Sequence, residues 1–464
     1  MQWISPIVDV WRKKMYDLKI QNATYYSCDM FLKGNIYISD GIIKCISLED
    51  SPSKEVIDAK NYFVLPGIID PHMHFRDPGN TEREDFYSGS QAAAAGGITT
   101  VFEMPISKPP VYNTHILDNR IRIAKEKSMV NFAFYGAAGY ENLDDLDDLS
   151  RAGVVAFKTF LHPAPIGRDE EFRGLTVRDD GELFRLFQKA ADYDFRLCFH
   201  AENNDIIKAC AEKLEIEDNS YHYKSRPKSA ELSSVSTLIH LAESFKVKIG
   251  ICHISCPEAI DLIQAAKKRG LDVIAETCPH YLVMDHGHIM KYGAFAKCNP
   301  PLRSKEDVKG MWHHLSKRHI DTLCSDHAPF VLEEKNKGIK ASYAGMPGIE
   351  VSLPIMLNQV NLGNLTLGDV VRLMSENIAK LYGLYPRKGS LSVGADADIT
   401  IVDMNRQHVF KKDHLKTKSK DTALVFDGMQ VKGMPVYTIV SGQTVMDHGQ
   451  VSLLKGHGKF VKRL

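Results

Sequence analysis

The sequence predicts an α/β fold in which a (β/α)8 barrel of the TIM type lies beside a small β-sandwich domain built from both ends of the chain. From Ile68 to about residue 385, apolar strand-like segments alternate with helical patterns, as in a parallel sheet with crossover helices. Before and after this region, short strand-like segments and turns dominate. We therefore expect an N-terminal extension at 1–14, a composite β-domain at 15–65 and 386–464, and the barrel at 66–385.

The first part of the β-domain is expected as short strands separated by turn residues such as Ser39-Asp40-Gly41. These strands are 17–20, 35–38 and 41–46. The tail returns to the same character, with a turn leading into a strand within 389–403 and a further strand at 436–440. Neither end has enough strands to bury a core alone, so we expect the two ends to combine into one domain.

Eight apolar segments make up the expected barrel strands, and helical patterns at 181–194, 229–245 and 257–269 supply part of the crossovers between them. The expected strands are 68–70, 99–103, 130–135, 154–158, 196–200, 247–253, 272–276 and 322–326. Gly- and Pro-containing segments at 163–168 and 331–346 connect elements and are candidates for substrate lids.

The charge balance excludes several classes of partner. Lys plus Arg and Asp plus Glu number 58 each, so the net charge is zero and nothing indicates binding to nucleic acid or to an acidic membrane surface. No apolar run approaches the roughly 18 residues that a membrane span needs. The 9 cysteines are scattered without a Cys-x-x-Cys pair, which argues against a disulfide framework and favours a reducing, cytoplasmic location.

The triplet His72-Met73-His74 follows the first expected barrel strand. Side chains two residues apart point to the same face of a strand, so both imidazoles face one way. Two neutral imidazoles side by side suit a divalent transition metal, although two ordinary histidines near a strand end would look the same.

Five of the eight expected strands end with residues that could contribute to a metal site. In such barrels the carboxyl ends of the strands converge on one face, where the chemistry lies. Each residue alone has an ordinary explanation, such as a core histidine, a lysine that reaches the surface or a helix N-cap. Together they predict a metal site. The candidates are His72, His74, Lys158, His200, His253 and Asp326.

Lys158 differs from the other candidates, because an ammonium group cannot bind a cation and an apolar strand is a poor environment for a free charge. Two solutions exist. The pKa of the amine falls, or CO2 adds to the neutral amine and gives a carbamate. A carbamate is an anionic oxygen ligand that can bridge two metal ions.

These residues resemble the cyclic amidohydrolases of the amidohydrolase superfamily, the group of dihydroorotases, allantoinases and hydantoinases with dihydropyrimidinases. The resemblance covers nearly the whole chain from about Met15, and its motifs occur in the same order. The segments that carry it are DPHMHFRDPG at 70–79, AGGITT at 95–100, FKTF at 157–160, HAEN at 200–203, CHIS at 252–255, CPHY at 278–281, NPPLR at 299–303 and SDHAP at 325–329.

The resemblance implies hydrolysis of a ring amide C–N bond at a centre of two divalent metal ions, usually zinc. It implies that His72, His74 and Asp326 hold one ion, that His200 and His253 hold the other, and that N6-carboxylated Lys158 bridges them. Asp326 would also be catalytic, as the group that moves the proton to the leaving nitrogen. Substrate contacts are expected from Arg76, Asn299 and His327. The partner is a small cyclic amide, and the protein is expected as a homodimer or homotetramer.

Three features bear on the substrate. Arg76 is like the arginine with which dihydroorotases hold a substrate carboxylate, or else a structural ion-pair residue. Dihydroorotases usually have asparagine after the next Met-Pro, where this chain has Ile106. Allantoinases typically have an apolar residue there, and the chain also lacks the tyrosine that hydantoinases carry shortly after Phe157-Lys158.

We therefore expect an allantoinase-like enzyme that converts allantoin to allantoate, with dihydroorotase or hydantoinase and dihydropyrimidinase as alternatives. A more distant alternative is a dihydropyrimidinase-like scaffold without activity. Such scaffolds have lost the metal ligands, whereas all six positions are intact here. A mononuclear deaminase of the same superfamily is disfavoured by the lysine in its Phe-Lys-Thr-Phe context.

Overall fold

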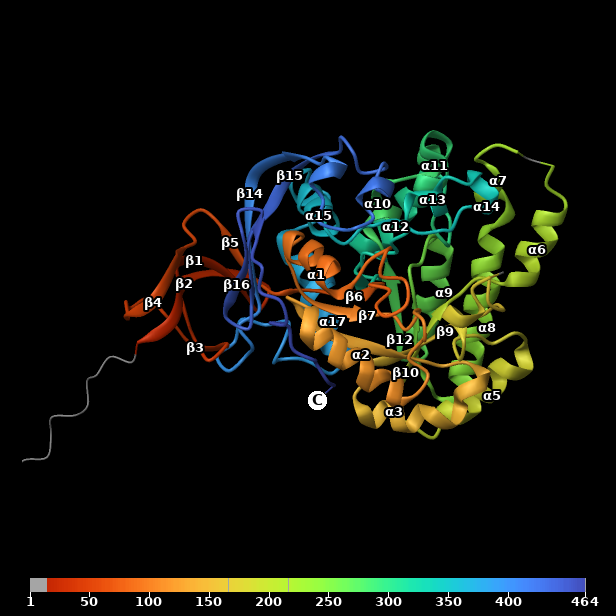
Figure 1. Cartoon of the computed structure of the whole chain (residues 1–464), viewed down its shortest axis with the longest axis horizontal. Coiled ribbons are helices and arrows are strands. Elements are labelled where there is room, and N and C mark those ends of the chain that lie inside the picture. Colours follow the sequence, from red (N-terminus) through yellow and green to blue (C-terminus); the bar gives the residue numbers. More distant parts are fainter. Residues whose placement is uncertain (1–14, 166, 216, 464) are drawn as a thin grey trace, which may run out of the picture.

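The computed structural model describes residues 15–463 except 166 and 216, so the expected extension at 1–14 lies outside the described residues. Two sheets organise the chain (Figure 1). One sheet, with strand order β6 to β13, contains eight strands and forms the barrel. The other contains nine strands and joins the two ends of the chain, visible in Figure 1 as red and orange strands beside blue ones. The predicted fold class is confirmed.

The eight barrel strands pair in the order of the sequence, and every neighbouring pair is parallel. Parallel pairing in sequence order requires crossover helices on the outside, which explains the alternating pattern. The strands are β6 (Ile68–Met73), β7 (Ile98–Glu103), β8 (Asn131–Ala137), β9 (Ala156–Phe160), β10 (Arg196–His200), β11 (Lys248–Ile251), β12 (Val273–Thr277) and β13 (Thr322–Leu323).

Two strands are shorter than the sequence predicts. The segments expected at 247–253 and 322–326 end at Ile251 and Leu323. His253 (φ 39°) and Asp326 (φ 44°) have left-handed backbone conformations, which are incompatible with a continuing strand. Both residues therefore lie on the turns that follow their strands and not within them.

The helices surround the barrel and fill the connections. The helix expected at 181–194 ends earlier, at Ala190, whereas those expected at 229–245 and 257–269 match to within one residue at each end. The helices are α1 (Phe86–Ala95), α2 (Thr114–Lys127), α3 (Leu146–Ala152), α4 (Asp169–Phe172), α5 (Asp180–Ala190), α6 (Asn204–Glu212), α7 (Tyr221–Ser225), α8 (Lys228–Phe245), α9 (Pro257–Lys268), α10 (Pro279–Val283), α11 (His286–Tyr292), α12 (Lys305–Ser316), α13 (Leu332–Lys335), α14 (Gly338–Ala341), α15 (Ser352–Asn361), α16 (Leu367–Val371) and α17 (Asn377–Leu381).

The barrel closes between the segment after β13 and β6, through a side chain as well as the backbone. The amide of His74 donates to the carbonyl oxygen of His327 at 2.9 Å. The buried carboxylate of Asp70 accepts a hydrogen bond from the amide of Ser325 at 3.1 Å and another from its hydroxyl group. This seam places the segment that carries His72 and His74 directly beside the turn that carries Asp326.

The nine-stranded sheet has its own core, in which Ile20, Ile38, Ile399 and Ile439 come from both ends of the chain. Apart from the parallel pairs of β1 with β4 and β5, its pairings are antiparallel. Its strands are β1 (Tyr16–Ser27), β2 (Met30–Ser39), β3 (Ile42–Ser47), β4 (Ser53–Asp58), β5 (Phe63–Pro66), β14 (Ile399–Val409), β15 (Gln430–Val440), β16 (Gln443–Asp447) and β17 (Gln450–Val451).

The chain passes from this sheet into the barrel at Gly67, between β5 and β6. A Cβ atom there would lie 2.2 Å from Oγ1 of Thr99, so only glycine fits.

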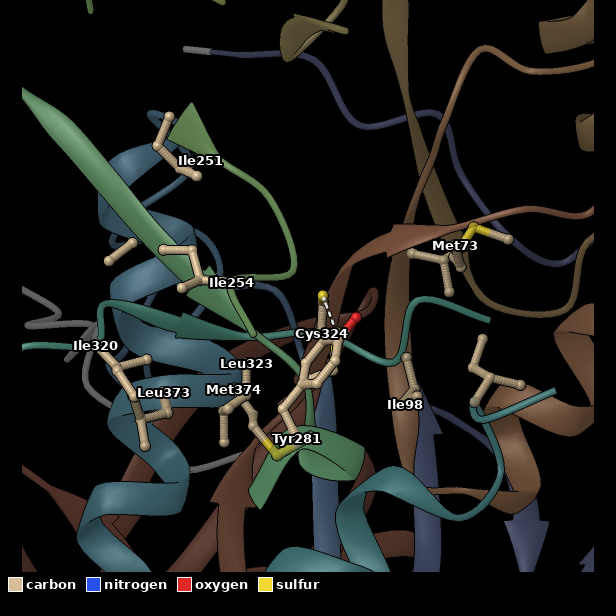
Figure 2. Packing of buried hydrophobic residues seen from close by; sticks show 14 of the residues in the cluster. Met73, Ile98, Ile251, Ile254, Tyr281, Ile320, Leu323, Cys324, Leu373 and Met374 are labelled. Atoms are coloured by element: carbon tan, nitrogen blue, oxygen red, sulfur yellow. Dashed lines mark hydrogen bonds between the residues drawn. The ribbon is translucent and has the colours of Figure 1, made fainter. Parts of the chain in front are cut away.

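The main hydrophobic core fills the space between the barrel strands and their helices. Figure 2 shows one part of it, where Ile320, Leu323, Leu373 and Met374 gather beside one another. All nine cysteines are free thiols, as the sequence predicts. None of the helices in the described residues is both long enough and apolar enough to cross a bilayer.

Candidate metal centre and substrate cavity

The expected metal ligands gather at one end of the barrel, at the floor of a cavity of about 470 Å³. The imidazoles and the carboxylate line the cavity, whereas Lys158 lies beneath them in β9. The residues that the sequence analysis selected from five separate strands are thus brought together by the fold. Those that line the cavity are His72, His74, His200, His253 and Asp326.

The first group of ligand atoms centres on Asp326. Its Oδ1 lies 3.5 Å from Nε2 of His72 and 3.7 Å from Nε2 of His74. One ligand atom from each residue can be chosen so that all three lie within 4.8 Å of one another. Two imidazole nitrogens and a carboxylate oxygen at this separation fit a divalent cation such as zinc.

The second group consists of two histidines, His200 at the end of β10 and His253 on the turn after the neighbouring strand β11. Nδ1 of His200 lies 3.2 Å from Nε2 of His253. The ring of His253 lies 5.3 Å from that of His72, centroid to centroid, so the two groups adjoin. The arrangement therefore has room for two cations side by side.

Two buried glutamates lie behind the histidines, and the sequence analysis did not single them out. Oε1 of Glu276 lies 2.8 Å from Nδ1 of His72, and Oε2 of Glu202 lies 2.9 Å from Nε2 of His200. In both histidines the ring nitrogen opposite the cluster is held by a carboxylate, which fixes the orientation of the ring and leaves the other nitrogen to face the cluster. A glutamate next to the end of the buried strand Val273–Thr277 was an available signal for Glu276.

Lys158 is fully buried (0% exposed), and its Nζ has no hydrogen-bond partner among the described residues. The centroid of the Phe160 ring lies 5.2 Å from this Nζ atom. Burial lowers the pKa of Lys158, but Cys252 and Glu276 outweigh this effect and leave the pKa raised.

The imidazoles of His74 and His253 favour the neutral form, in which imidazole binds a metal ion. Burial lowers the pKa of His74 well below its usual range, and the neighbouring Arg76 adds to this effect. Burial and Lys158 do the same for His253. His72 differs, because Glu276 outweighs burial and raises its pKa to about 10. Nδ1 of both His74 and His253 is buried without a partner among the described residues.

Three residues of the site have a left-handed backbone conformation although they are not glycines: Arg76 (φ 59°), His253 (φ 39°) and Asp326 (φ 44°). Such conformations cost on the order of 1 kcal/mol or more and persist where the surrounding structure imposes them. Because all three lie at one cavity, the fold there places the side chains at the cost of a less favourable backbone conformation.

Two of the three expected substrate contacts line the cavity. Arg76 is 2% exposed, and its Nε and Nη1 have no hydrogen-bond partner among the described residues. Oδ1 of Asn299 is likewise buried without a partner. These groups offer hydrogen-bond donors and an acceptor to a polar ligand.

The third expected contact, His327, is not among the described residues that line the cavity. Its imidazole is buried, with Nε2 3.4 Å from Oε2 of Glu84, because its backbone takes part in the barrel seam and turns the side chain away. The geometry therefore does not support a substrate contact by His327.

The wall of the cavity is made of loops and contains arginine, aromatic and apolar side chains. Ile106 lines it, as does Phe330, whose ring lies 5.4 Å from Cζ of Arg76. Both candidate lid segments contribute, the first through residues such as Arg168 and the second through residues such as Tyr343. Their movement as lids stays a prediction.

Comparison with known proteins places this geometry in context. The model of the amidohydrolase family matches residues 63–445. An L-hydantoinase of Paenarthrobacter aurescens is 35% identical over 97% of this chain and 98% of its own length. A dihydroorotase of Methanothermobacter thermautotrophicus is 35% identical over 96% and 97%. An allantoinase of Escherichia coli is 32% identical over 96% and 98%.

Solved structures give the same result. An L-hydantoinase (dihydropyrimidinase) from Arthrobacter aurescens has a TM-score of 0.92 at 34% identity, and the match covers 97% of this chain and 100% of that one. A dihydropyrimidinase from Brevibacillus agri has a TM-score of 0.87 at 28% identity, with 96% and 98% covered. Relatives named for three different substrate rings are thus about equally similar to this chain. The comparisons therefore show the reaction class and do not identify which cyclic amide is the substrate.

Proposed function

We propose that this chain, which belongs to the amidohydrolase family and is a hydrolase acting on cyclic amides, opens the ring of a cyclic ureide, with allantoin favoured as substrate and allantoate as product. The observation that carries the proposal is the convergence of ligand-type side chains at the floor of a cavity with unsatisfied polar groups in its wall.

The donor set supports a centre of two metal ions. We assign His72, His74 and Asp326 to one ion and His200 and His253 to the other, with Glu276 and Glu202 orienting His72 and His200. When bound, two divalent cations, zinc in this proposal, would lower the pKa of a water molecule and polarise the ring carbonyl group.

Lys158 is proposed as the N6-carboxylated bridge between the ions. The lysine ammonium and CO2 give a carbamate and two protons, so a buried cation becomes an anionic oxygen ligand. The support is its full burial and its unpartnered Nζ beneath the two histidine groups. This change would remove an unsatisfied charge and supply the negative charge that two cations need.

Asp326 is proposed as the catalytic group that moves the proton. Its Oδ1 lies within 4 Å of Nε2 of both His72 and His74. A carboxylate at this position can take a proton from the attacking water and deliver it to the ring nitrogen as the C–N bond breaks. With this proton, the ring nitrogen leaves as a neutral amine or amide and not as an anion.

The wall of the cavity supports a neutral ureide. Ile106 presents an apolar side chain to the cavity and offers no donor to a substrate carboxylate. Arg76 can donate from Nε and Nη1 to a carbonyl oxygen, and Oδ1 of Asn299 can accept from an N–H group of the ureide. The unpaired guanidinium of Arg76 also favours a second candidate, dihydroorotate, because a carboxylate would pair with it directly.

The test is ring opening of allantoin, dihydroorotate, hydantoins and dihydropyrimidines by the purified, metal-replete protein and two variants. We expect allantoin to give the highest kcat/KM. Ile106→Asn should raise the activity on dihydroorotate relative to that on allantoin. Arg76→Met should abolish the activity on dihydroorotate. Higher wild-type activity on an acidic ring than on allantoin would overturn the allantoin assignment. No activity on any ring would overturn the proposal as a whole.

We further propose a cytoplasmic location, supported by nine free cysteines, and a homodimer or homotetramer, as the family resemblance suggests. Sedimentation of the purified protein tests the assembly.

A further inference from the structure

One wall of the cavity is a single short segment that includes α14 (Gly338–Ala341) and the residues that follow it. Within this segment, residues 340 and 342–345 line the cavity. Its most prominent side chain is Tyr343, whose ring lies 5.3 Å from that of Phe330. We refer to residues 339–345 as the wall segment.

Two buried lysines hold the wall segment by its backbone. Nζ of Lys297, which is 8% exposed, donates to the carbonyl oxygens of Ile339 (2.6 Å), Lys340 (3.3 Å) and Ser342 (2.6 Å). Nζ of Lys335, which is 1% exposed, donates to those of Tyr343 (3.0 Å) and Gly345 (2.8 Å). Two ammonium groups thus bind five carbonyl oxygens of a seven-residue stretch.

Neither ammonium group forms an ion pair with a carboxylate in the part of the chain that the structure describes. Positively charged neighbours add to the effect of burial, Arg226 for Lys297 and Lys297 for Lys335. Burying a cation without a counter-ion is costly, and carbonyl dipoles are the compensation available here. Burial accordingly lowers the pKa of Lys297 to about 8 and that of Lys335 to about 7.

The wall segment in turn supports the arginines of the cavity. Cζ of Arg168 lies 5.1 Å from the ring centroid of Tyr343, and Cζ of Arg76 lies 5.4 Å from that of Phe330. A planar guanidinium lying over an aromatic face is oriented by it. The position of Tyr343 therefore affects where the donors of Arg76 and Arg168 point.

We propose that Lys297 and Lys335 are positioning residues for the reaction. Their Nζ groups donate hydrogen bonds that fix the wall segment and, through Tyr343 and Phe330, the orientation of the arginines that meet the substrate. Lys297 itself lines the cavity, whereas Lys335 does not. Among the described residues no hydrogen bond or ion pair joins either lysine to the candidate metal ligands, so we expect the chemistry at the cavity floor to persist without them. The effect on substrate binding rests on the proposed function, whereas the effect on the wall segment does not.

The experiment compares Lys297→Met and Lys335→Met with the wild-type protein, all loaded with metal. Methionine keeps a flexible unbranched side chain and removes the donors. The matched control is Lys19→Met, which removes a lysine that is 7% exposed and paired with Asp50 in the β-domain, far from the cavity in the fold. Amide hydrogen exchange without substrate is measured first, and kcat and KM are measured second.

We expect amide exchange in peptides covering 339–345 to rise by about tenfold or more in both lysine variants. Lys297→Met removes the hydrogen bonds to three of the five carbonyl oxygens, and Lys335→Met removes those to the other two. Peptides covering 68–74 and 196–200 should exchange as in the wild type. KM should rise by about tenfold with kcat and metal content within about twofold. The control should change none of these values.

Unchanged exchange at 339–345 in the variants would overturn the proposal. So would a rise spread evenly over the barrel, which would show a merely structural role. If Lys297→Met is not recovered folded, Lys335→Met alone decides, because it removes two of the five bonds. Exchange is read without substrate, so a protein that hydrolyses no cyclic ureide would overturn the proposed function and leave this result interpretable.

Discussion

The floor and the wall of the cavity are built in different ways. The floor consists of side chains at the ends of adjacent parallel strands, where His72 and His200 are each braced by a buried glutamate. The wall consists of loops, and its side chains are held by arginine–aromatic contacts and by two buried lysines that bind backbone carbonyls. Strands fix positions through sheet register, whereas loops need dedicated contacts.

This difference separates two parts of the function, the reaction itself and the choice of substrate ring. Relatives named hydantoinase, dihydroorotase and allantoinase match this chain at 35%, 35% and 32% identity. Barrels of this type support different chemistries and substrates by variation of the loops at the carboxyl ends of their strands, so we expect the floor to set the reaction and the wall to select the ring. Changes to the floor should therefore affect every substrate, and changes to the wall should affect some substrates more than others.

The largest effect is expected at Lys158. Lys158→Ala should lose most bound metal and reduce kcat by about three orders of magnitude or more on every substrate, because in the proposed centre both cations would lose the anion between them. Metal analysis and steady-state kinetics measure this. Short carboxylic acids should restore part of the activity by entering the vacated space. An untreated variant with full activity would contradict the carbamate bridge.

The next largest effect is expected at Asp326. Asp326→Asn should lower kcat by about 10² to 10⁴, the usual contribution of a general acid–base group. Asparagine tolerates the left-handed backbone at this position (φ 44°), so the fold should persist. Circular dichroism and bound metal are the controls. A rate close to that of the wild type would remove Asp326 from proton transfer.

The glutamates behind the floor should have an intermediate effect. Glu276→Gln and Glu202→Gln should each weaken metal binding by roughly 10- to 100-fold, because the amide is a weaker partner for the imidazole N–H group than a carboxylate. Competition with a chelator measures the affinity. Glu55→Gln, an exposed position on β4, is the matched control. Unchanged affinity in both variants would show that the strands alone orient the histidines.

The smallest effect is expected in the wall, at Glu171, which accepts from Arg168 and Arg83. Burial raises the pKa of Glu171, but Arg168, Arg76 and Arg83 outweigh it and lower the pKa from 4.5 to about 2. A lowered folded-state pKa adds stability above pH 4.5, and this contribution is lost as the pH falls towards 2.

The wild-type protein should therefore lose on the order of 1 kcal/mol more stability than Glu171→Gln over that pH range. Urea unfolding at several pH values measures the difference. Parallel pH profiles for the two proteins would contradict this assignment and would indicate that the wall tolerates a neutral residue there.

Much of the floor could be predicted from the sequence. Residues such as His200 and His253 stand out because each closes an apolar segment of the sequence, and the parallel strands of one barrel end on one face. Arg76 and Asn299 were selected from motifs and do line the cavity. His327 was selected in the same way and lies behind the site, because the seam of the barrel turns its side chain away.

The sequence by itself determined the fold class and a metal site, because both depend on local patterns: alternating strands and helices, and ligand-type residues at the carboxyl ends of strands. It indicated the reaction class through its resemblance to the cyclic amidohydrolases. Only the tertiary structure decided which side chains meet across the barrel. Glu276 reaches His72 over 204 residues of chain, and Lys297 reaches the wall segment over more than 40. Contacts of this kind depend on register and packing, which no local pattern of residues encodes.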